Sequence, residues 1–296
     1  MLASWEPLSQ TIGAYVFAVV MGLLWGSFAN VCIYRMPPSD DHPNGLSVVT
    51  PGSHCFACGK PVTWYDNVPL LSYLWLRGKC RACKASFSAR YLVVEALVGA
   101  LFGLAWWFAM VPTFQESFDV RLLRFGVYAA FIVVMVVIAF IDLDTMLILD
   151  KVTYPTIPAF YALGLLLPER HWWDGLIGAG VGYGIPWLIG VLYKLIRKRE
   201  GMGLGDAKLL ALVGALLGWH GVVAALFGGS VLGVVMTVAM RLARGRAAPA
   251  AANDNAADGD GAGDDLMHTE LPFGPYLVTA ALFYMFAEPW TVLNLL

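Results

Sequence analysis

Charged residues are scarce in this sequence. Asp, Glu, Lys and Arg make up only 14% of its 296 residues, whereas 59% are hydrophobic. A soluble globular domain carries roughly 25% charged residues, so the composition excludes a soluble enzyme, and it equally excludes a disordered or collagen-like chain. It predicts instead an all-α polytopic membrane protein whose long apolar helices contact lipid.

Several other features are also missing. The net charge is only −2, which gives no indication of nucleic-acid binding. The N-terminal segment lacks the basic stretch and small-residue cleavage site of a signal peptide, so we expect the first apolar segment to be retained. The five histidines are scattered, without the spacing of a metal site. No glycine-rich nucleotide-binding motif follows a predicted strand, and no internal repeat is visible.

The apolar segments predict about eight transmembrane helices. They cover residues 12–33, 92–111, 125–141, 153–168, 175–196, 207–219, 222–240 and 273–293. Of the 19 Lys and Arg residues, 16 flank one side of these segments and only Arg121, Arg124 and Arg170 flank the other. The positive-inside rule therefore places both termini outside and the loop 34–91 in the cytoplasm.

These segments divide the chain into three parts. Residues 1–33 hold the first helix, residues 34–91 form a long cytoplasmic loop, and residues 92–296 form the remaining membrane core. A loop of nearly sixty residues is too long to be a passive connector. Within the core, residues 245–268 are rich in Ala, Asp, Asn and Gly without apolar periodicity, and we expect them to be disordered.

The cytoplasmic loop contains two C-x-x-C pairs. Cys55 and Cys58 are followed after 21 residues by Cys80 and Cys83. Four thiolates can occupy the corners of a tetrahedron, which Zn²⁺ prefers, and such a closed site has no open position for catalysis. We therefore predict a structural zinc site, with two disulfides as the alternative, which a reducing cytoplasm disfavours. The fifth cysteine, Cys32, is a small apolar residue to which we assign no role.

Acidic residues flank two of the predicted membrane helices. Asp142, Asp144 and Asp150 follow the third segment, and Asp206 starts the sixth, all on the predicted cytoplasmic side. Ionisable residues at such positions are usually functional. Two carboxylates brought close together share a proton, and they can activate a water molecule for attack on a peptide bond. The alternative is that these are ordinary solvated loop acids.

The residues around Asp206 fit a peptide-binding site. Gly203 and Gly205 would allow the backbone of a substrate to approach closely. Lys208 could pair with a carboxylate or extend to the lipid head groups. The alternative is that the two glycines only interrupt a helix.

Together, these motifs resemble those of the prepilin peptidases, also called type IV leader peptidases, which are membrane aspartic proteases of the G-x-G-D type. The similarity runs through nearly the whole chain. It covers residues 26–31 with Arg35 and Pro37, both cysteine pairs, 64–73, 77–81, 88–91 with Glu95, Asp142 with Asp150, 201–209, and 272–276. One position departs from the family pattern. The residue before Asp150 is commonly a proline in the family, whereas here it is Leu149.

The resemblance implies a bifunctional enzyme of the bacterial inner membrane. Asp142 and Asp206 would cleave the leader peptides of prepilins and pseudopilins after a glycine on the cytoplasmic side, with Asp144 and Asp150 shaping the site. The enzyme would then methylate the new N-terminal amine with S-adenosylmethionine, an activity linked to the opening motif and the cysteine loop. Asn30, Arg35 and Glu95 are candidate residues for this methylase.

Three other functions are weighed against this interpretation. The chain could be a peptidase alone, or a non-enzymatic membrane scaffold of a pilus or secretion assembly that docks through its zinc loop. A transporter is disfavoured because its ionisable residues would lie near the midplane of the bilayer, commonly between inverted repeats. The sequence does not determine the oligomeric state or the identity of the pilins.

Overall fold

The described part of the chain is all-helical. The computed structural model describes residues 12–110, 116–197, 203–247 and 272–293. Its long helices are α2 (Ile12–Arg35), α4 (Arg90–Met110), α5 (Phe118–Thr145), α6 (Asp150–Gly164), α7 (Trp172–Arg197), α8 (Leu204–Ala247) and α9 (Gly274–Leu293). The loop between α2 and α4 contains a short 3-10 helix, η2 (Trp64–Asn67), and α3 (Leu71–Leu76).

Five of these helices are long and apolar enough to cross a membrane. They are Ile12–Arg35, Arg90–Met110, Phe118–Thr145, Trp172–Ile196 and Leu204–Leu242. The protein is therefore a multi-pass membrane protein. The predicted segments 153–168 and 273–293 coincide with α6 and α9. At 15 residues, α6 is only about 22 Å long, shorter than the roughly 30 Å hydrocarbon core.

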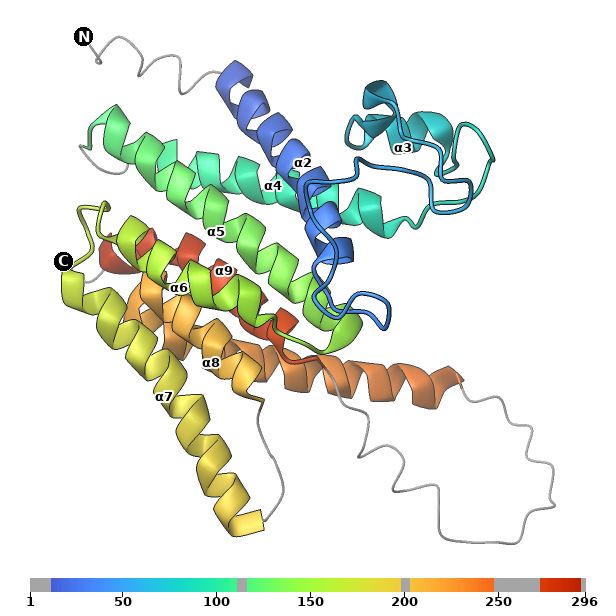
Figure 1. The fold of residues 1–296 in the computed structure, drawn as a ribbon. Coiled ribbons are helices and arrows are strands. Elements are labelled where there is room, and N and C mark those ends of the chain that lie inside the picture. The colour runs from blue at the N-terminus through green and yellow to red at the C-terminus, as the bar shows by residue number, and fades with distance from the viewer. Residues whose placement is uncertain (1–11, 111–115, 198–202, 248–271, 294–296) are drawn as a thin grey trace, which may run out of the picture.

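The predicted segments 207–219 and 222–240 both fall within α8. This element is interrupted at Gly218, whose φ of 70° and ψ of −176° are not helical. Such a conformation is readily accessible only to glycine. Figure 1 shows the second half of α8 running back toward the end at which its first half starts. The two predicted spans are thus the two halves of one kinked element.

Glycines set the packing of α7 against the first half of α8. A Cβ atom on Gly214 would lie 2.1 Å from the carbonyl oxygen of Gly178, and one on Gly182 would lie 2.2 Å from that of Leu210. Residue numbers in these contacts rise along α7 while they fall along α8, so the two helices are antiparallel. Small residues are typical of such close membrane-helix interfaces.

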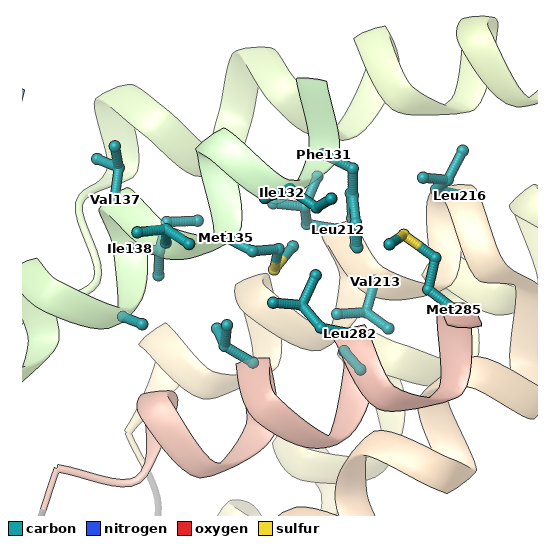
Figure 2. Close-up of a cluster of buried hydrophobic side chains, with 14 of the residues drawn as sticks. Phe131, Ile132, Met135, Val137, Ile138, Leu212, Val213, Leu216, Leu282 and Met285 are labelled. Atoms are coloured by element: carbon teal, nitrogen blue, oxygen red, sulfur yellow. The ribbon is translucent and has the colours of Figure 1, made fainter. Parts of the chain in front are cut away.

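The hydrophobic core lies where α5, α8 and α9 meet. Figure 2 shows Phe131, Ile132 and Met135 of α5 packing toward Leu212 of α8 and Met285 of α9. All five side chains are fully buried. Figure 1 shows α5 between α2 and α4 on one side and α6 and α9 on the other. This central helix carries one of the predicted aspartate motifs at its end.

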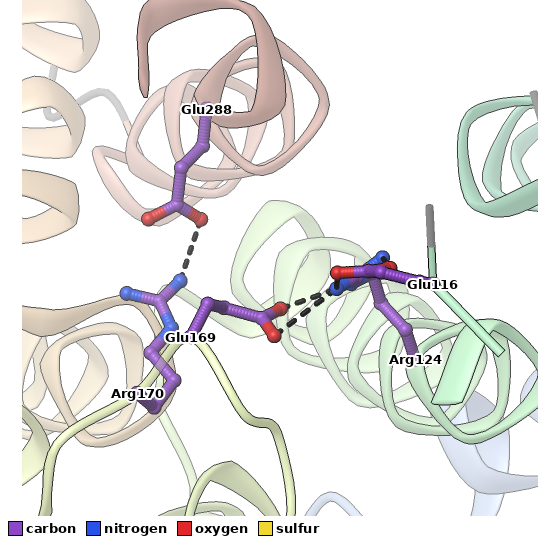
Figure 3. A network of polar contacts seen from close by, with 5 residues as sticks. All are labelled: Glu116, Arg124, Glu169, Arg170 and Glu288. Atoms are coloured by element: carbon purple, nitrogen blue, oxygen red, sulfur yellow. Dashed lines mark hydrogen bonds and ion pairs between the residues drawn. The ribbon is translucent and has the colours of Figure 1, made fainter. Parts of the chain in front are cut away.

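A polar cluster lies at the opposite end of α5. Arg124 binds Glu116 and Glu169 with N–O distances of 2.6–3.0 Å, and Arg170 binds Glu288 of α9 at 2.5 Å (Figure 3). The cluster joins the start of α5 to the α6–α7 connection and to α9. Arg124 and Arg170 belong to the three basic residues that the charge count places on the outer side.

The low-complexity segment is only partly described. Residues 245–247 form the end of α8, whereas residues 248–268 of the segment that we predicted to be disordered lie outside the described residues.

Candidate functional site

The helix ends bring two predicted aspartates together. Asp142 lies in the last turn of α5 and Asp206 in the first turn of α8, 64 residues later in the sequence. Their side chains are close enough to interact electrostatically. Asp142 is only 5% exposed.

The start of α9 holds Asp142 in place. The backbone N–H of Gly274 donates a hydrogen bond to Asp142 Oδ2 at 3.0 Å, in a buried contact. A Cβ atom on Gly274 would lie 2.6 Å from the same oxygen, so only glycine allows this approach. Sequence reasoning missed this role. The signal available was a glycine between Phe273 and Pro275 at the start of an apolar segment.

The other two acids face basic residues rather than the pair. Asp144 forms an ion pair with Arg90, which starts α4 and also donates a hydrogen bond to the carbonyl oxygen of Phe140 at 3.0 Å. Asp150 pairs with Lys208, so of the two partners predicted for Lys208 the structure selects a carboxylate. These pairs join α4 to α5 and α6 to α8 beside the aspartates.

The two glycines of the G-x-G-D motif have different surroundings. A Cβ atom on Gly205 would lie 3.1 Å from the Ile148 side chain, which comes from the connection between α5 and α6. One on Gly203 would meet nothing closer than 3.9 Å. Gly203 therefore leaves space beside Asp206, whereas Gly205 accommodates another part of the same chain. Residues 201–202 of this motif lie outside the described residues.

Leu149 adopts the conformation of the proline that it replaces. Its φ of −74° and ψ of 124° are those of an extended residue before a helix, and φ is within the range of proline. Its carbonyl oxygen accepts hydrogen bonds from the N–H groups of Val152 and Thr153. The backbone at Leu149 is thus compatible with the proline of the family pattern.

The loop between α2 and α4 contacts this site from the side of α6. The ammonium group of Lys151 donates hydrogen bonds to the carbonyl oxygens of Met36 and Asn44, which follow α2. Lys151 directly follows Asp150. The loop and the aspartate pair therefore lie at the same end of the helices.

The four cysteines of the loop converge on one point. Their sulfur atoms all lie within 4.8 Å of one another, and those of Cys55 and Cys83 are 3.7 Å apart. A disulfide would place two sulfurs about 2.05 Å apart. A tetrahedral zinc site with Zn–S bonds of about 2.3 Å would place them about 3.8 Å apart. The arrangement fits a bound metal ion, and all four cysteines are free thiols.

The two cysteine pairs form similar knuckles. The N–H of Gly59 donates to the carbonyl oxygen of Cys55, and that of Lys84 donates to that of Cys80. Gly59 and Lys84 both have a positive φ, of 68° and 61°. The backbone N–H groups of Cys83 and Ala82 lower the pKa of the Cys80 thiol to about 6. These contacts favour the thiolate form of Cys80, which is the form that binds metals.

The three candidate methylase residues line one cavity. Asn30, Arg35 and Glu95 are all buried and border a cavity of about 400 Å³ between α2, α4 and the loop. Asn30 donates a hydrogen bond to the Tyr91 carbonyl oxygen at 3.1 Å, and Arg35 donates to that of Ser47 at 3.0 Å. The structure thus gathers into one place residues that the sequence offered only as separate candidates.

Comparisons with known proteins agree with one another. Residues 20–109 match the bacterial peptidase A24 N-terminal domain, and residues 129–238 match the type IV leader peptidase family. The chain is similar to the prepilin leader peptidase/N-methyltransferase of Neisseria gonorrhoeae, with 35% identity over 79% of this chain and 84% of the relative. It is also 35% identical to that of Aeromonas hydrophila, over 88% of this chain and 86% of the relative. No solved structure gives a significant match.

Proposed function

This chain belongs to the type IV leader peptidase family, and we propose that it cleaves prepilin leader peptides with Asp142 and Asp206 as its catalytic pair. Like its curated relatives, it is a bifunctional enzyme, a prepilin leader peptidase and N-methyltransferase. The observation that carries the assignment of the catalytic pair is the convergence of the two carboxylates at the ends of α5 and α8.

The two aspartates have different surroundings, which gives them different roles. Asp142 accepts a hydrogen bond from the Gly274 N–H, and such a bond favours the ionised form of a carboxyl group. It therefore remains the carboxylate that accepts a proton from the attacking water. Asp206 carries the shared proton and polarises the scissile carbonyl. The proton that Asp142 has taken from the water then passes to the leaving amine. No covalent intermediate is needed.

The neighbouring ion pairs shape this site. Asp144 with Arg90 and Asp150 with Lys208 are positioning pairs that fix the ends of α5, α6 and α8 around the catalytic carboxylates. Gly203 leaves the open space next to Asp206 in which the extended substrate backbone would lie.

The cysteine cluster is proposed to hold one Zn²⁺ in a structural role. Cys55, Cys58, Cys80 and Cys83 would fill its four positions, so no position is left for a substrate. Zinc would supply the cross-link between the two knuckles of the domain 34–91. We link this domain to methylation, for which S-adenosylmethionine supplies the methyl group.

The helix order supports eight membrane crossings. They are α2, α4, α5, α6, α7, the two halves of α8, and α9. The basic residues Arg35, Arg90 and Lys151 lie at the helix ends near the aspartates, whereas Arg121 and Arg124 lie at the opposite end of α5. By the positive-inside rule, the zinc domain and the active site face the cytoplasm across the bacterial inner membrane. Prepilins and pseudopilins are the proposed substrates, and lipids surround the helices.

The test is the replacement Asp206→Asn. We expect leader removal from a purified prepilin to fall by about 10²- to 10⁴-fold, because the general acid is lost. Methylation of a pre-cut pilin should persist, since that reaction needs no water activated by two carboxylates. Intact-mass measurement with S-adenosylmethionine present reads both reactions. Asp119→Asn, an exposed residue at the other end of α5, is the matched control. Full leader removal by Asp206→Asn would refute the catalytic pair, and a scaffold would tolerate that change.

A further inference from the structure

The cavity beside the zinc loop has a composition that suggests its ligand. Its wall includes residues from the cytoplasmic half of α2, the start of α4, the first cysteine knuckle and the segments that flank the second. Its volume of about 400 Å³ is typical of a small-molecule site. Such sites combine an apolar lining with a few converging polar groups, and both are present here.

The carboxylate of Glu95 is one of the charged groups that line the cavity. The residue is only 8% exposed and lines the cavity from the second turn of α4. Its Oε2 accepts the N–H of Leu70 at 2.9 Å, and the Ser27 side chain lies beside the carboxylate in the cavity wall. Among the described residues, none forms an ion pair with it. A buried carboxylate without a counter-ion is costly, and a cationic ligand would offset that cost.

Gly26, which precedes Ser27 in the opening motif (residues 26–31), determines where this carboxylate lies. A Cβ atom on Gly26 would lie 2.8 Å from the Cα of Glu95. Without a side chain at Gly26, α2 and α4 approach closely enough for Ser27 to reach the carboxylate. The opening motif therefore builds the wall of the cavity that holds Glu95.

Aromatic rings line another part of the cavity. Tyr34 of α2 and Phe56 of the first cysteine knuckle have ring centroids 4.8 Å apart, with 52° between their planes. Each is slightly more than half exposed, so its ring is available to a ligand. Aromatic rings of this kind bind planar heterocycles by stacking and attract cations to their faces.

We propose that this cavity binds S-adenosylmethionine, with Glu95 facing the sulfonium and the Tyr34–Phe56 pair against the adenine ring. The inference rests on the proposed function, because the chain needs a methyl donor and has no conventional nucleotide motif. The lone pair of the substrate amine forms the new N–C bond while the S–C bond breaks. The electron pair of that bond stays on sulfur, which becomes neutral, and the methylated ammonium then loses one proton.

The location of the cavity also suits a product that arrives from the aspartate pair. Tyr91 lines the cavity, and its neighbour Arg90 binds Asp144, two residues beyond Asp142. The newly cut N-terminus therefore has a short path from one site to the other at the same end of the helices.

The first test measures donor binding directly, by calorimetry on the purified full chain in detergent. We expect Phe56→Ala to weaken binding of S-adenosylmethionine by about three- to tenfold, as expected for the loss of one aromatic contact. The matched control is Trp75→Ala, an aromatic residue of the same loop that is 82% exposed and does not line the cavity. Equal affinities for these two variants, each with one zinc per chain, would overturn the proposal.

The second test uses the charge of the donor. S-adenosylhomocysteine has the same adenosine and amino acid groups but a neutral sulfur. If Glu95 faces the sulfonium, Glu95→Gln should weaken binding of S-adenosylmethionine about tenfold while changing that of S-adenosylhomocysteine little. An equal loss for both compounds would refute the sulfonium contact. If the wild-type chain methylates a pilin but Phe56→Ala binds the donor normally, only the assignment of the donor site to this cavity is rejected. A wild-type chain that neither methylates nor binds the donor would reject the proposed function.

Discussion

At the scale of single residues, one backbone hydrogen bond assigns different roles to two identical side chains. Asp142 and Asp206 are both aspartates at helix ends, but only Asp142 is described as accepting a backbone N–H from another helix. That bond depends on the missing side chain of Gly274. A residue 132 positions away thus fixes the geometry of the active site.

We predict that Gly274→Ala will lower the rate of leader cleavage by about 10- to 100-fold. The new Cβ would lie 2.6 Å from Asp142 Oδ2, so the carboxylate must move and lose a hydrogen bond to a charged group, which contributes about 1.5–3 kcal/mol. Single-turnover cleavage of a prepilin measures the effect. Gly233→Ala is the control, because its Cβ would have only ordinary contacts with α9, the nearest at 3.7 Å. Equal rates for the two variants would contradict the role of Gly274.

At the scale of elements, glycine positions decide how closely α7 and α8 pack. Gly178 of α7 lies against Gly214 of α8, whereas Gly180, between two packed glycines of α7, has no atom within 4 Å of its ideal Cβ position. The same helix therefore carries glycines that are required by packing and one that is not. Asp206 lies two turns from Gly214 on α8, so this interface also supports the active site.

These positions make opposite predictions for stability. Gly214→Ala should destabilise the protein by about 1–3 kcal/mol, because its Cβ would lie 2.1 Å from a carbonyl oxygen and would force the helices apart. Gly180→Ala should be neutral or stabilising by about 0.5–1 kcal/mol, since alanine favours a helix over glycine. Thermal unfolding in detergent compares them. A lower melting temperature for Gly180→Ala than for Gly214→Ala would contradict the described packing.

At the scale of the whole molecule, the zinc loop and the membrane core are joined but supported separately. Arg90 and Lys151 connect the loop and α4 to the ends of α5 and α6. The fold of the loop itself depends on the two cysteine knuckles, whereas the aspartates lie on helices held by the apolar core. Loss of the metal should therefore affect the two activities unequally.

We predict that Cys80→Ser will release the metal and reduce methylation far more than cleavage. A small four-thiolate domain gains much of its folding free energy from zinc, and Phe56 and Lys79 of the donor cavity lie within or directly beside its knuckles. Metal content by mass spectrometry should fall from one per chain, and paired assays should show the unequal loss. Cys32→Ala, which alters a buried cysteine of α2, should keep the metal. Equal loss of both activities at normal membrane levels would show that the loop also serves the peptidase.

The sequence by itself determined the class of protein and its chemical groups. Scarce charge and long apolar segments specified a helical membrane protein, because lipid tolerates few other structures. The C-x-x-C spacing specified a metal-ligand set, and the acidic residues at span edges specified the candidate catalytic pair. These features depend on composition and on residues close together in the chain, so one sequence is enough to read them.

Tertiary structure alone decided how those groups are used. It paired Asp144 with Arg90 and Asp150 with Lys208, and it folded α8 back at Gly218. It also gathered residues of α2, α4 and the zinc loop around one cavity and brought the Gly274 N–H to Asp142. Each of these contacts depends on how closely particular helices approach. That distance is set by packing between residues far apart in the chain, which no local pattern encodes.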